Sequence, residues 1–295
     1  MRTVRWTCPP PRSRAARTAR LAVLVAGLVW VPVARADTVT IKGSDTMLIL
    51  AQQWMEHYKR EHPTAVLQLT GGGSETGIAA LTNGTTDIAA ASRPMTDAEV
   101  ARAEARHDRR IVQIPVAYDA LAIVVNEANP VDVLTLSDLA RVFRGEVQDW
   151  KELGGSTAPI AIYGRDHSSG SWTFFRRQVL HDDDFSVDAL NLVGTASIVD
   201  SVAKDVNGIG YGGIAYAGGL KNVRLAKDAG GTPVAATVES VRNGTYPLAR
   251  RLWLHVTEPH DEDVARFLAW VRGPAGQGVV AGVGFFPLQT EGTGW

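Results

Sequence analysis

The sequence predicts an α/β protein with mainly parallel sheets, arranged as two lobes. Short β-rich runs alternate with helical patterns almost throughout the chain after Asp37, which is typical of βαβ units. The run 121–125 (LAIVV) is continuously apolar, as in a strand that is buried on both faces. A chain of 295 residues is long for one doubly wound sheet, so a second lobe inserted into the first is the more economical arrangement.

The elements of the first lobe follow from local patterns. A helical pattern begins near Met47 and stops before Pro63, because proline cannot continue a helix. A charged pattern at 97–107 indicates a surface helix between two strands. We expect strands at 39–42, 66–70, 88–91 and 111–116, and helices at 47–61, 76–81 and 97–107.

The later elements and the lobe boundaries are predicted in the same way. Ser137 is expected to cap a helix that ends at Phe143, and the Gly-rich segment 208–213 suits a crossing where the chain must bend. We further expect a strand at 160–163 and helices at 172–180, 198–205 and 261–272. The predicted division is a signal peptide at 1–36, lobe 1 at 37–118 plus 214–295, and lobe 2 at 119–213.

The first 36 residues have the pattern of a secretory signal peptide. They hold seven Arg and no acidic residue, and Leu21–Val33 is an apolar stretch followed by Ala34-Arg35-Ala36, a small-x-small cleavage pattern. The apolar stretch falls short of the roughly 20 residues that span a bilayer, although an uncleaved anchor is the alternative interpretation. The leader contains the only cysteine, Cys8, so we expect an exported, periplasmic mature chain without a disulfide.

Composition excludes several classes of protein. With 45% hydrophobic and 21% charged residues and a mean hydropathy of −0.04, the chain fits neither a disordered nor a polytopic membrane protein. Beyond the leader, 23 basic residues face 31 acidic ones, a net charge of −8. This acidic balance argues against a nucleic-acid binder, which would present a basic face.

Three segments share one design, a short polar or Gly-rich loop that opens into a helix. They are 43–46 (GSDT), 71–77 (GGGSETG) and 167–171 (HSSGS). A helix N-terminus has unpaired N–H groups and a partial positive charge, so it can bind an anion, although ordinary N-capping explains any single loop equally well. Arg93 and Arg165 follow strands, at the end where open α/β sheets bind ligands. Together these features predict an anion site.

Other motifs in the sequence match known functional patterns only in part. Segment 208–213 matches G-x-G-x-x-G, but neither a long helix nor a well-placed acidic residue follows it. Ser74 and Ser169 lack the second glycine of G-x-S-x-G, and neither has a histidine placed by sequence pattern as its base. No metal-ligand cluster stands out. We therefore expect no catalytic residues, no metal and no cofactor.

At this point the motifs resemble a known family. The ordered series GSDTM, GGGSETGI, TDIAAASR, AYDALAIVVN, LARVFRGEVQDW, GRDHSSGS and GIGYGGI is similar to the phosphate-binding proteins of bacterial phosphate ABC transporters, as is the closing stretch DVARFLAWVRGPAGQGVVAGVGFFPL. The match covers about Val39–Leu288. The resemblance implies a two-lobed, type II periplasmic binding fold that closes on its ligand like a hinge, with the second lobe inserted into the first.

The resemblance also implies a set of ligand-binding residues. The positions that match the family's motifs, together with neighbours that would complete the site, are Ser44, Asp45, Thr46, Ser74, Ser92, Arg93, Asp119, Arg165, Ser169, Gly170 and Ser171. Arg93 stands where some members have an acidic residue, so Asp119 is the candidate to supply that carboxylate. Glu75 stands where many relatives have a small residue. Because a carboxylate would repel an anion, we expect Glu75 to point to solvent.

These residues imply a mechanism for binding one dehydrated phosphate ion. Arg165 is expected to form a bidentate pair with the ligand, with Arg93 as a second clamp. Asp119 or Asp45 would accept a hydrogen bond from the proton that phosphate retains near neutral pH. Fully ionised sulfate has no proton to donate, so the same carboxylate would oppose it as an unpaired like charge.

The resulting expectation is high-affinity binding of inorganic phosphate and its delivery to an ABC-type membrane permease, by a chain that is monomeric and binds no nucleic acid. The alternatives are a binding protein for molybdate, tungstate or sulfate, a secreted phosphate-releasing hydrolase with Ser74 or Ser169 as nucleophile, and a phosphate sensor that signals without transport.

Overall fold

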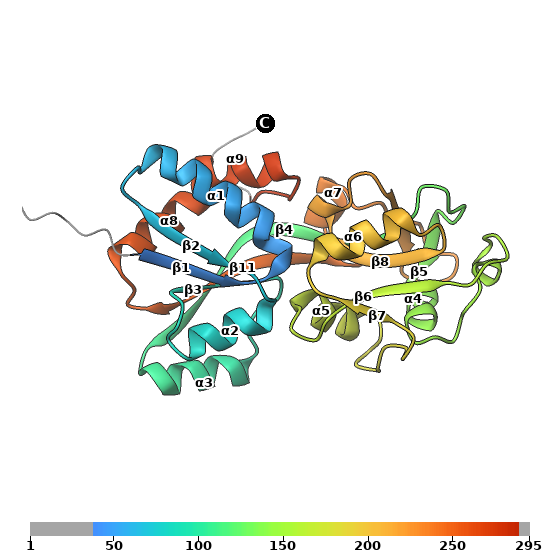
Figure 1. Ribbon diagram of the computed structural model, residues 1–295, viewed down its shortest axis with the longest axis horizontal. Coiled ribbons are helices and arrows are strands. Elements are labelled where there is room, and N and C mark those ends of the chain that lie inside the picture. Colours follow the sequence, from blue (N-terminus) through green and yellow to red (C-terminus); the bar gives the residue numbers. More distant parts are fainter. Residues whose placement is uncertain (1–37, 289–295) are drawn as a thin grey trace, which may run out of the picture. The chain divides into compact units, whose positions relative to one another are not determined.

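The computed structural model describes residues 38–288, and the predicted signal peptide lies outside the described residues. These residues form one nine-stranded mixed sheet with helices on its faces and a separate two-stranded sheet (Figure 1). The strands are β1 (Thr38–Gly43), β2 (Val66–Thr70), β3 (Ile88–Ala91), β4 (Arg110–Val125), β5 (Val133–Thr135), β6 (Ala161–Arg165), β7 (Leu190–Leu192), β8 (Gly208–Gly213), β9 (Lys221–Asn222), β10 (Arg224–Ala226) and β11 (Ala249–Glu258). The helices are α1 (Leu48–Glu61), α2 (Ser74–Thr82), α3 (Asp97–His107), α4 (Leu136–Phe143), α5 (Gly170–Gln178), α6 (Thr195–Lys204), α7 (Val238–Arg242), α8 (Glu262–Arg272) and α9 (Pro274–Val283), with short 3₁₀ turns η1 (Asp45–Met47), η2 (Trp150–Leu153) and η3 (Ile214–Tyr216).

The first part of the sheet has the order β2-β1-β3-β11-β4. Helices α1, α8 and α9 cover one face and α2 and α3 the other (Figure 1). Strand β3 shows why both faces are apolar, since side chains alternate along a strand. Ile88 and Ala90 pack in the core with α1 and α8, whereas Ala89 and Ala91 pack with α2 and α3.

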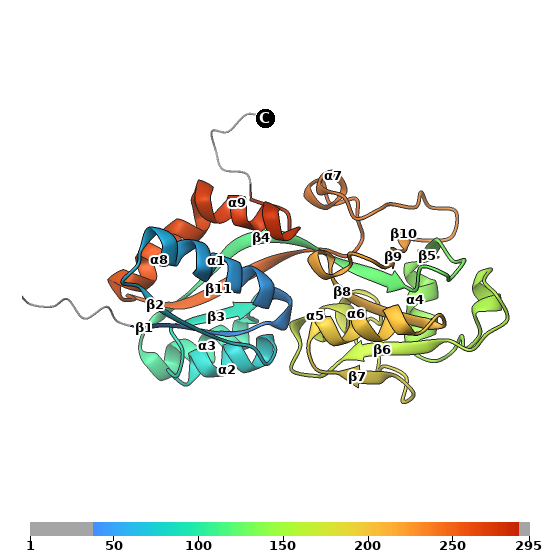
Figure 2. The same ribbon diagram turned by 45° about the horizontal axis from the view of Figure 1, so that its top comes forward.

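Strand β4 joins the two parts of the sheet. Its residues 110–120 pair with β11, and its residues 121–125 pair with β8. Residues 120–125 are all buried, as the apolar run in the sequence predicts. Figure 2 shows β4 and β11 passing side by side between the two parts. The change of partner, between residues 120 and 121, lies two residues beyond the predicted lobe boundary at 118–119.

The second part of the sheet contains β8, β6 and β7, with β9 beside β4. Phe143 of α4, Phe175 of α5 and Tyr211 of β8 form its aromatic core on one face. On the other face α6 packs through Ile198 and Val202. This part completes the two-lobed α/β architecture that the sequence predicts.

The glycines of β8 have a different role from the expected one. Segment 208–213 is a buried strand, and a Cβ at Gly210 would lie only 2.6 Å from Ile198 Cγ2. These glycines therefore permit α6 to pack closely on the strand, rather than a bend between lobes.

The return crossing accordingly lies farther along the chain. Strand β9 pairs with β4, β10 pairs with β5, and Val241, Tyr246 and Leu248 pack in the core of the second part. Segment 217–248, expected in lobe 1, thus packs with the inserted part of the chain. We propose that lobe 1 comprises residues 38–120 and 249–288, and that lobe 2 comprises residues 121–248.

Two further expectations are corrected. The sheet is mixed rather than mainly parallel, because β11 runs antiparallel to β3 and β4, and β4 runs antiparallel to β8. Helix α4 is capped by Thr135, not by Ser137, since Thr135 and Asp138 form a reciprocal capping box. Within 38–288, no helix is long and apolar enough to cross a membrane.

Candidate functional site

The first of the three polar loops connects β1 to η1. Ser44 N donates to Ala90 O at 2.8 Å, which fixes the loop to the end of β3. Gly43 has a φ of +139°, and a Cβ there would lie 2.2 Å from Ala90 O, so the approach requires glycine. The loop holds Ser44, Asp45 and Thr46 buried at the carboxyl end of β1.

The second loop leads into α2 and is tied to the first. Gly72 N donates to Asp45 Oδ1 at 2.8 Å. Ser74, at the first position of α2, is fully buried, and its Oγ accepts a hydrogen bond of 3.0 Å from Ser92 N. The Oγ atoms of Ser74 and Ser92 lie 3.3 Å apart. Two of the five serines predicted for the site, Ser74 and Ser92, therefore lie together at the N-terminus of α2.

The third loop brings α5 of lobe 2 to the same place. Ser169 caps α5, since its Oγ accepts from Ser171 N and Trp172 N at 3.2 and 3.4 Å. A Cβ on Gly170 would lie 2.4 Å from Ser74 Oγ and 2.7 Å from Ser92 Oγ. The N-termini of α2 and α5 thus approach each other directly, and both direct the positive ends of their helix dipoles toward this region.

Arg165 joins the two lobes in this region. The residue is 1% exposed, and its Nη2 donates to Asp45 Oδ2 of lobe 1 at 2.7 Å. Its Nη1 donates to Thr195 Oγ1 at 2.9 Å, while its buried Nε has no hydrogen-bond partner among the described residues. A buried N–H group without a partner is costly, which indicates that Nε is placed for a further acceptor.

A second buried ion pair lies where the lobes join. Arg250 of β11 is directly opposite Asp119 of β4 in the strand register, and its Nε donates to Asp119 Oδ2 at 2.8 Å. Asp119 Oδ1 accepts from Ile214 N at 3.1 Å. Arg250 Nη1 donates to Ser171 Oγ at 2.9 Å, and Ser171 Oγ is 3.1 Å from Thr46 Oγ1. The ion pair is thereby connected to α5 and to the first loop.

Burial has the largest effect on the pKa values of Asp119 and Arg250. Desolvation raises the pKa of the Asp119 carboxyl, and the charge and hydrogen bond of Arg250 oppose this effect only in part. Desolvation likewise lowers the pKa of Arg250, against the charge of Asp119. Each charged group of this pair therefore depends on its partner to offset the cost of desolvation.

Arg93 does not act as the expected second clamp in this structure. Its Nε and Nη2 donate to Glu75 at 3.0 and 2.5 Å, and its Nη1 and Nη2 donate to Glu99 at 2.8 and 2.7 Å. Nη1 also donates to Pro94 O at 2.8 Å. All five N–H groups of the guanidinium are thus used, and none is left for an anion. Burial would lower the pKa of Arg93, but the hydrogen bonds to Glu99 and Glu75 raise it above its ordinary value.

The expectation that Glu75 points to solvent is also wrong. Its carboxylate pairs with Arg93, and its Oε1 accepts from Thr173 Oγ1 of α5 at 3.2 Å. The side chain is only 34% exposed. Glu75 therefore faces a cation and a hydroxyl group, which removes the electrostatic objection that its sequence position raised.

Two residues near this group were missed in the sequence. Thr195 gives no local signal, because a threonine at a helix start is common. Arg250 does give one, since it alternates in phase with the buried Leu252 and Leu254 along the strand. A charged side chain on the buried face of a strand needs a partner, so this position indicates a buried ion pair, although the sequence pattern does not identify Asp119 as the partner.

The arrangement is suited to a small anion. Arginine side chains, serine and threonine hydroxyl groups and two helix N-termini are buried around one region, and two carboxylates balance the charges of Arg165 and Arg250. The serines proposed as nucleophiles show different contacts: Ser74 is bonded to Ser92, and Ser169 caps α5. Among residues 38–288, no group of three or more His, Cys, Asp or Glu side chains is placed to hold a metal ion.

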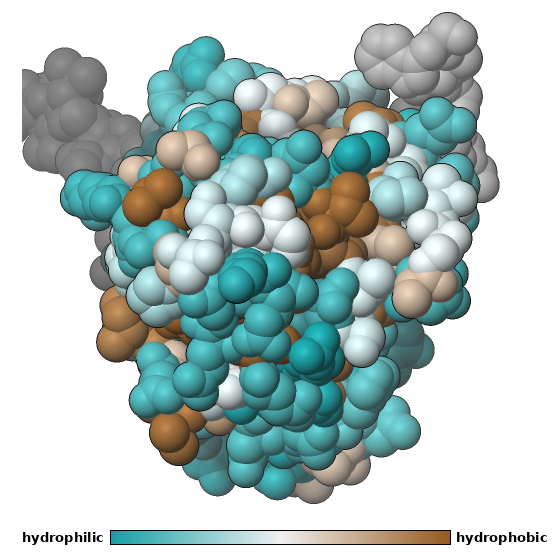
Figure 3. Space-filling view, turned by 90° about the vertical axis from the view of Figure 1, so that its right-hand side faces the viewer, coloured by the Kyte–Doolittle hydropathy of each residue, from teal (hydrophilic) through white to brown (hydrophobic). Residues whose placement is uncertain are grey.

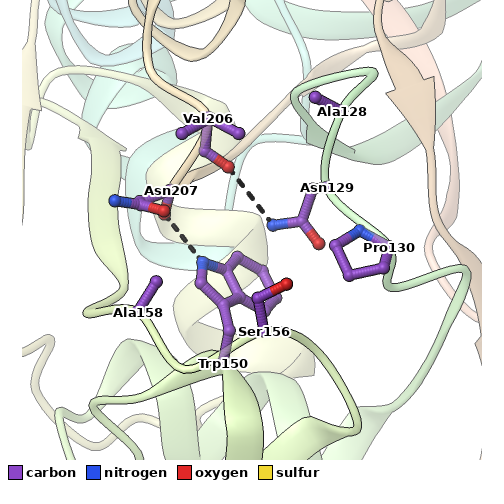
Figure 4. Close-up of a pocket in the computed structure, with 8 residues that line it drawn as sticks. All are labelled: Ala128, Asn129, Pro130, Trp150, Ser156, Ala158, Val206 and Asn207. Carbon is purple, nitrogen blue, oxygen red and sulfur yellow. Dashed lines mark hydrogen bonds between the residues drawn. The ribbon is translucent and has the colours of Figure 1, made fainter.

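A small pocket of about 50 Å³ lies elsewhere in lobe 2, between loops (Figure 4). It lies beside Trp150, whose Nε1 donates to Asn207 O at 2.9 Å, and Asn129, whose Nδ2 reaches Val206 O at 3.5 Å. These bonds fasten neighbouring loops, and within the described part of the chain no charged side chain lines the pocket. The pocket is therefore not a second candidate for an anion site.

Comparison with known proteins identifies similar chains. Residues 32–274 match the family described as the PBP superfamily domain. The chain is 37% identical over 266 residues to the phosphate-binding protein PstS of Pseudomonas aeruginosa, with 84% of this chain and 82% of that protein covered. It is 30% identical over 300 residues to protein SphX of Synechococcus elongatus, with 97% and 88% covered.

A solved structure extends this similarity to the fold. The structure of a putative phosphate ABC transporter substrate-binding protein from Clostridium perfringens, with bound phosphate, superposes with a TM-score of 0.79 at 26% identity. The match covers 86% of this chain and all of that chain. The two-lobed fold of type II periplasmic binding proteins is therefore common to both.

Proposed function

The chain belongs to the PBP superfamily, among the phosphate-binding proteins of bacterial phosphate ABC transporters, and on this basis we propose that its two lobes enclose one inorganic phosphate ion for import. The observation that carries the proposal is Arg165, a buried arginine of lobe 2 that is held by Asp45 of lobe 1 beside the facing N-termini of α2 and α5. Its free Nε is a donor for a phosphate oxygen.

The proposed ligand groups come from both lobes. The donors are the guanidinium groups of Arg165 and Arg250, the hydroxyl groups of Thr46, Ser74, Ser169 and Ser171, and N–H groups at the starts of η1, α2 and α5. A hydrogen bond to a charged group contributes about 1.5–3 kcal/mol net, whereas a micromolar dissociation constant needs about 8 kcal/mol. Six such bonds are therefore sufficient, even after part of their free energy offsets dehydration and lobe closure.

Asp45 and Asp119 are proposed to provide selectivity. Either carboxylate can accept a hydrogen bond from the protonated oxygen of hydrogen phosphate, and either would face sulfate as an unpaired like charge. The net charge of −8 beyond the leader does not attract an anion over long range, so the affinity is assigned to these local groups. Molybdate, tungstate or sulfate as the main ligand is not favoured, since the similar proteins from Pseudomonas aeruginosa and Clostridium perfringens are named for phosphate.

Closure is proposed to occur about the two strands that connect the lobes. Within residues 38–288 the backbone passes between lobes at 120–121 in β4 and at 248–249 before β11, and these crossings are neighbours in the sheet. Two adjacent strand crossings form a hinge about which the lobes can rotate. Opening would separate Arg165 from Asp45 and Gly170 from Ser74, and would therefore expose the ligand.

The setting of this function is proposed from the same relatives. We propose export to the periplasm through a cleaved signal peptide, delivery to a membrane permease, and no catalytic step. We also propose a monomer. The end of lobe 2 seen in Figure 3 supports this, because its surface is mainly hydrophilic and its apolar residues form small separate groups.

The test is calorimetric titration of the mature chain from Asp37 to Trp295, stripped of bound anion, with phosphate, sulfate and molybdate at neutral pH. One-to-one binding of phosphate at micromolar affinity or tighter, without heat from sulfate, is the expected result. Tight binding of sulfate or molybdate would show that neither carboxylate faces the ligand. No heat from phosphate would contradict the proposed function.

A further inference from the structure

The carboxylate of Glu75 connects the two lobes at the edge of the proposed phosphate site. Glu75 follows Ser74 directly in the first turn of α2, so its position relative to the site is fixed by the helix. It lies in lobe 1, yet it makes two contacts with lobe 2. Both contacts are with the segment that leads into α5 and with α5 itself.

In lobe 1 the carboxylate is fixed by Arg93. The guanidinium lies between Glu75 and Glu99 and donates two hydrogen bonds to each. Glu99 is itself held by the capping box of α3, in which it accepts from Thr96 N at 2.8 Å. Glu75 is therefore oriented before it meets lobe 2, and little side-chain entropy remains to be lost on contact.

In lobe 2 the partners are a backbone carbonyl and a hydroxyl group. Glu75 N donates to Ser168 O at 3.1 Å, and Thr173 Oγ1 donates to Glu75 Oε1 at 3.2 Å. Close contact is possible because Gly73 has no side chain, since a Cβ there would lie 2.2 Å from Ser168 O. These bonds can form only when the lobes are together.

From these contacts we propose that Glu75, Arg93 and Thr173 form an interlobe latch, in which Glu75 is a positioning residue that stabilises the closed form and slows phosphate release. The inference rests on the proposed function. The latch explains why a carboxylate is present next to an anion site. Arg93 neutralises the charge of Glu75, and Thr173 donates a hydrogen bond to the Glu75 carboxylate. None of the three side chains of the latch is among the groups proposed to bind phosphate. The latch therefore affects phosphate release only by holding the two lobes together.

A purely electrostatic role of Glu75 predicts the opposite sign. If Glu75 were only a negative charge near phosphate, its removal would strengthen phosphate binding, because like charges repel. If it is a latch, its removal weakens phosphate binding. Glu75→Ala therefore separates the two roles by the direction of the change in Kd.

The experiment measures phosphate release from the mature protein. Protein loaded with radiolabelled phosphate is diluted into excess unlabelled phosphate, and the dissociation rate is followed by rapid filtration. Thr173→Val, which keeps the shape but removes the hydroxyl, is expected to raise the dissociation rate about fivefold, because a partly exposed hydrogen bond to a carboxylate is lost. Thr173→Ser retains the hydroxyl and is expected to release phosphate at the unaltered rate.

A double-mutant cycle tests whether Thr173 acts through Glu75. In a Glu75→Ala background, Thr173→Val should change the dissociation rate by less than about 1.5-fold. Glu56→Gln, at an exposed position on α1 paired with Arg60, is the matched control for loss of one negative charge. Circular dichroism and Tm establish that each variant is folded.

The outcomes separate the two proposals. Unchanged release by Thr173→Val, an undiminished effect in the Glu75→Ala background, or tighter binding by Glu75→Ala would each overturn the latch while leaving phosphate binding intact. Failure of the unaltered protein to bind phosphate would overturn the proposed function and the latch with it.

Discussion

Arg165 Nη2 donates to Asp45 Oδ2 at 2.7 Å across 120 positions of sequence, and both residues are buried. This ion pair connects lobe 2 to lobe 1 and orients the guanidinium, whose Nε remains available within the described part of the chain. The buried arginine is thus a structural contact, and we propose that it is also a binding group for phosphate. Changes at Arg165 are therefore expected to affect lobe closure and ligand affinity together.

Arg165→Lys is expected to weaken phosphate binding by about 100-fold. Lysine keeps the positive charge but replaces the planar fork with a single ammonium group, which cannot bond Asp45, Thr195 and a phosphate oxygen in the same geometry. A loss of this size corresponds to about 2.7 kcal/mol. Calorimetric titration of the folded variant measures it. Affinity within threefold of the unaltered protein would show that Arg165 has no contact with the ligand.

Asp119→Asn is expected to reduce the preference for phosphate over sulfate by at least about tenfold. The amide no longer repels fully ionised sulfate, and its NH₂ group can donate to an anion oxygen. Competition titrations with the two anions give the ratio. Because Asp119 is also the partner of Arg250, we expect the variant to have a lower Tm, and the ratio is insensitive to that loss. Asp45→Asn is the parallel variant, and an unchanged ratio for Asp119→Asn would assign the role to Asp45.

The sequence correctly predicted those strands, helices and loops that local residue patterns define. The strands at 66–70 and 88–91 and the helix at 97–107 have the predicted bounds, because apolar periodicity, turns and caps define them locally. The three loops that open into helices were found for the same reason. Glycine and serine at these positions have direct roles in the backbone approach and in the caps.

The parts that the sequence did not predict depend on long-range pairing. Arg250 lies opposite Asp119 only because β11 returns beside β4 in one register, across 131 positions. The contact of Glu75 with Arg93 likewise depends on α2 packing on β3, and the boundary at 248–249 depends on which strands pair with β4. Local propensity contains no information about these pairings.

Stability is expected to fall on acidification because of His255. This side chain is fully buried, and desolvation lowers its pKa from 6.5 to about 4. The unfolded chain then binds a proton that the folded protein does not bind, so the free energy of unfolding decreases as the pH falls from about 6.5 to about 4. The shift corresponds to at most about 3 kcal/mol.

His255→Leu tests this contribution. Among residues 38–288 Nδ1 has no hydrogen-bond partner, and Nε2 makes only a long contact of 3.4 Å with Arg93 O, so we expect the variant to fold. Urea unfolding of both proteins between pH 4 and 7.5 gives the difference in pH dependence, which cancels the titration of carboxylates common to both. Parallel curves for the two proteins would exclude His255 as the source.

Gly170→Ala is expected to prevent the lobes from closing. The added Cβ would lie 2.4 Å from Ser74 Oγ and 2.7 Å from Ser92 Oγ, and both serines are buried and bonded to each other. The clash is between lobes, so the variant can relieve it by opening without disturbing either core. We expect phosphate affinity to fall by more than about tenfold, while the Tm without phosphate changes by less than a few degrees. Small-angle scattering should give the same radius of gyration with and without phosphate.

Gly278→Ala provides the matched control for this substitution. Gly278 lies within α9, where a Cβ would meet no described atom of another element within 4 Å, and alanine is the better helix former. This variant should bind phosphate like the unaltered protein and show an equal or higher Tm. Phosphate-induced compaction in Gly170→Ala equal to that in Gly278→Ala would mean that α2 and α5 do not approach in the bound form. The proposed convergence of their N-termini on the ligand would then be rejected.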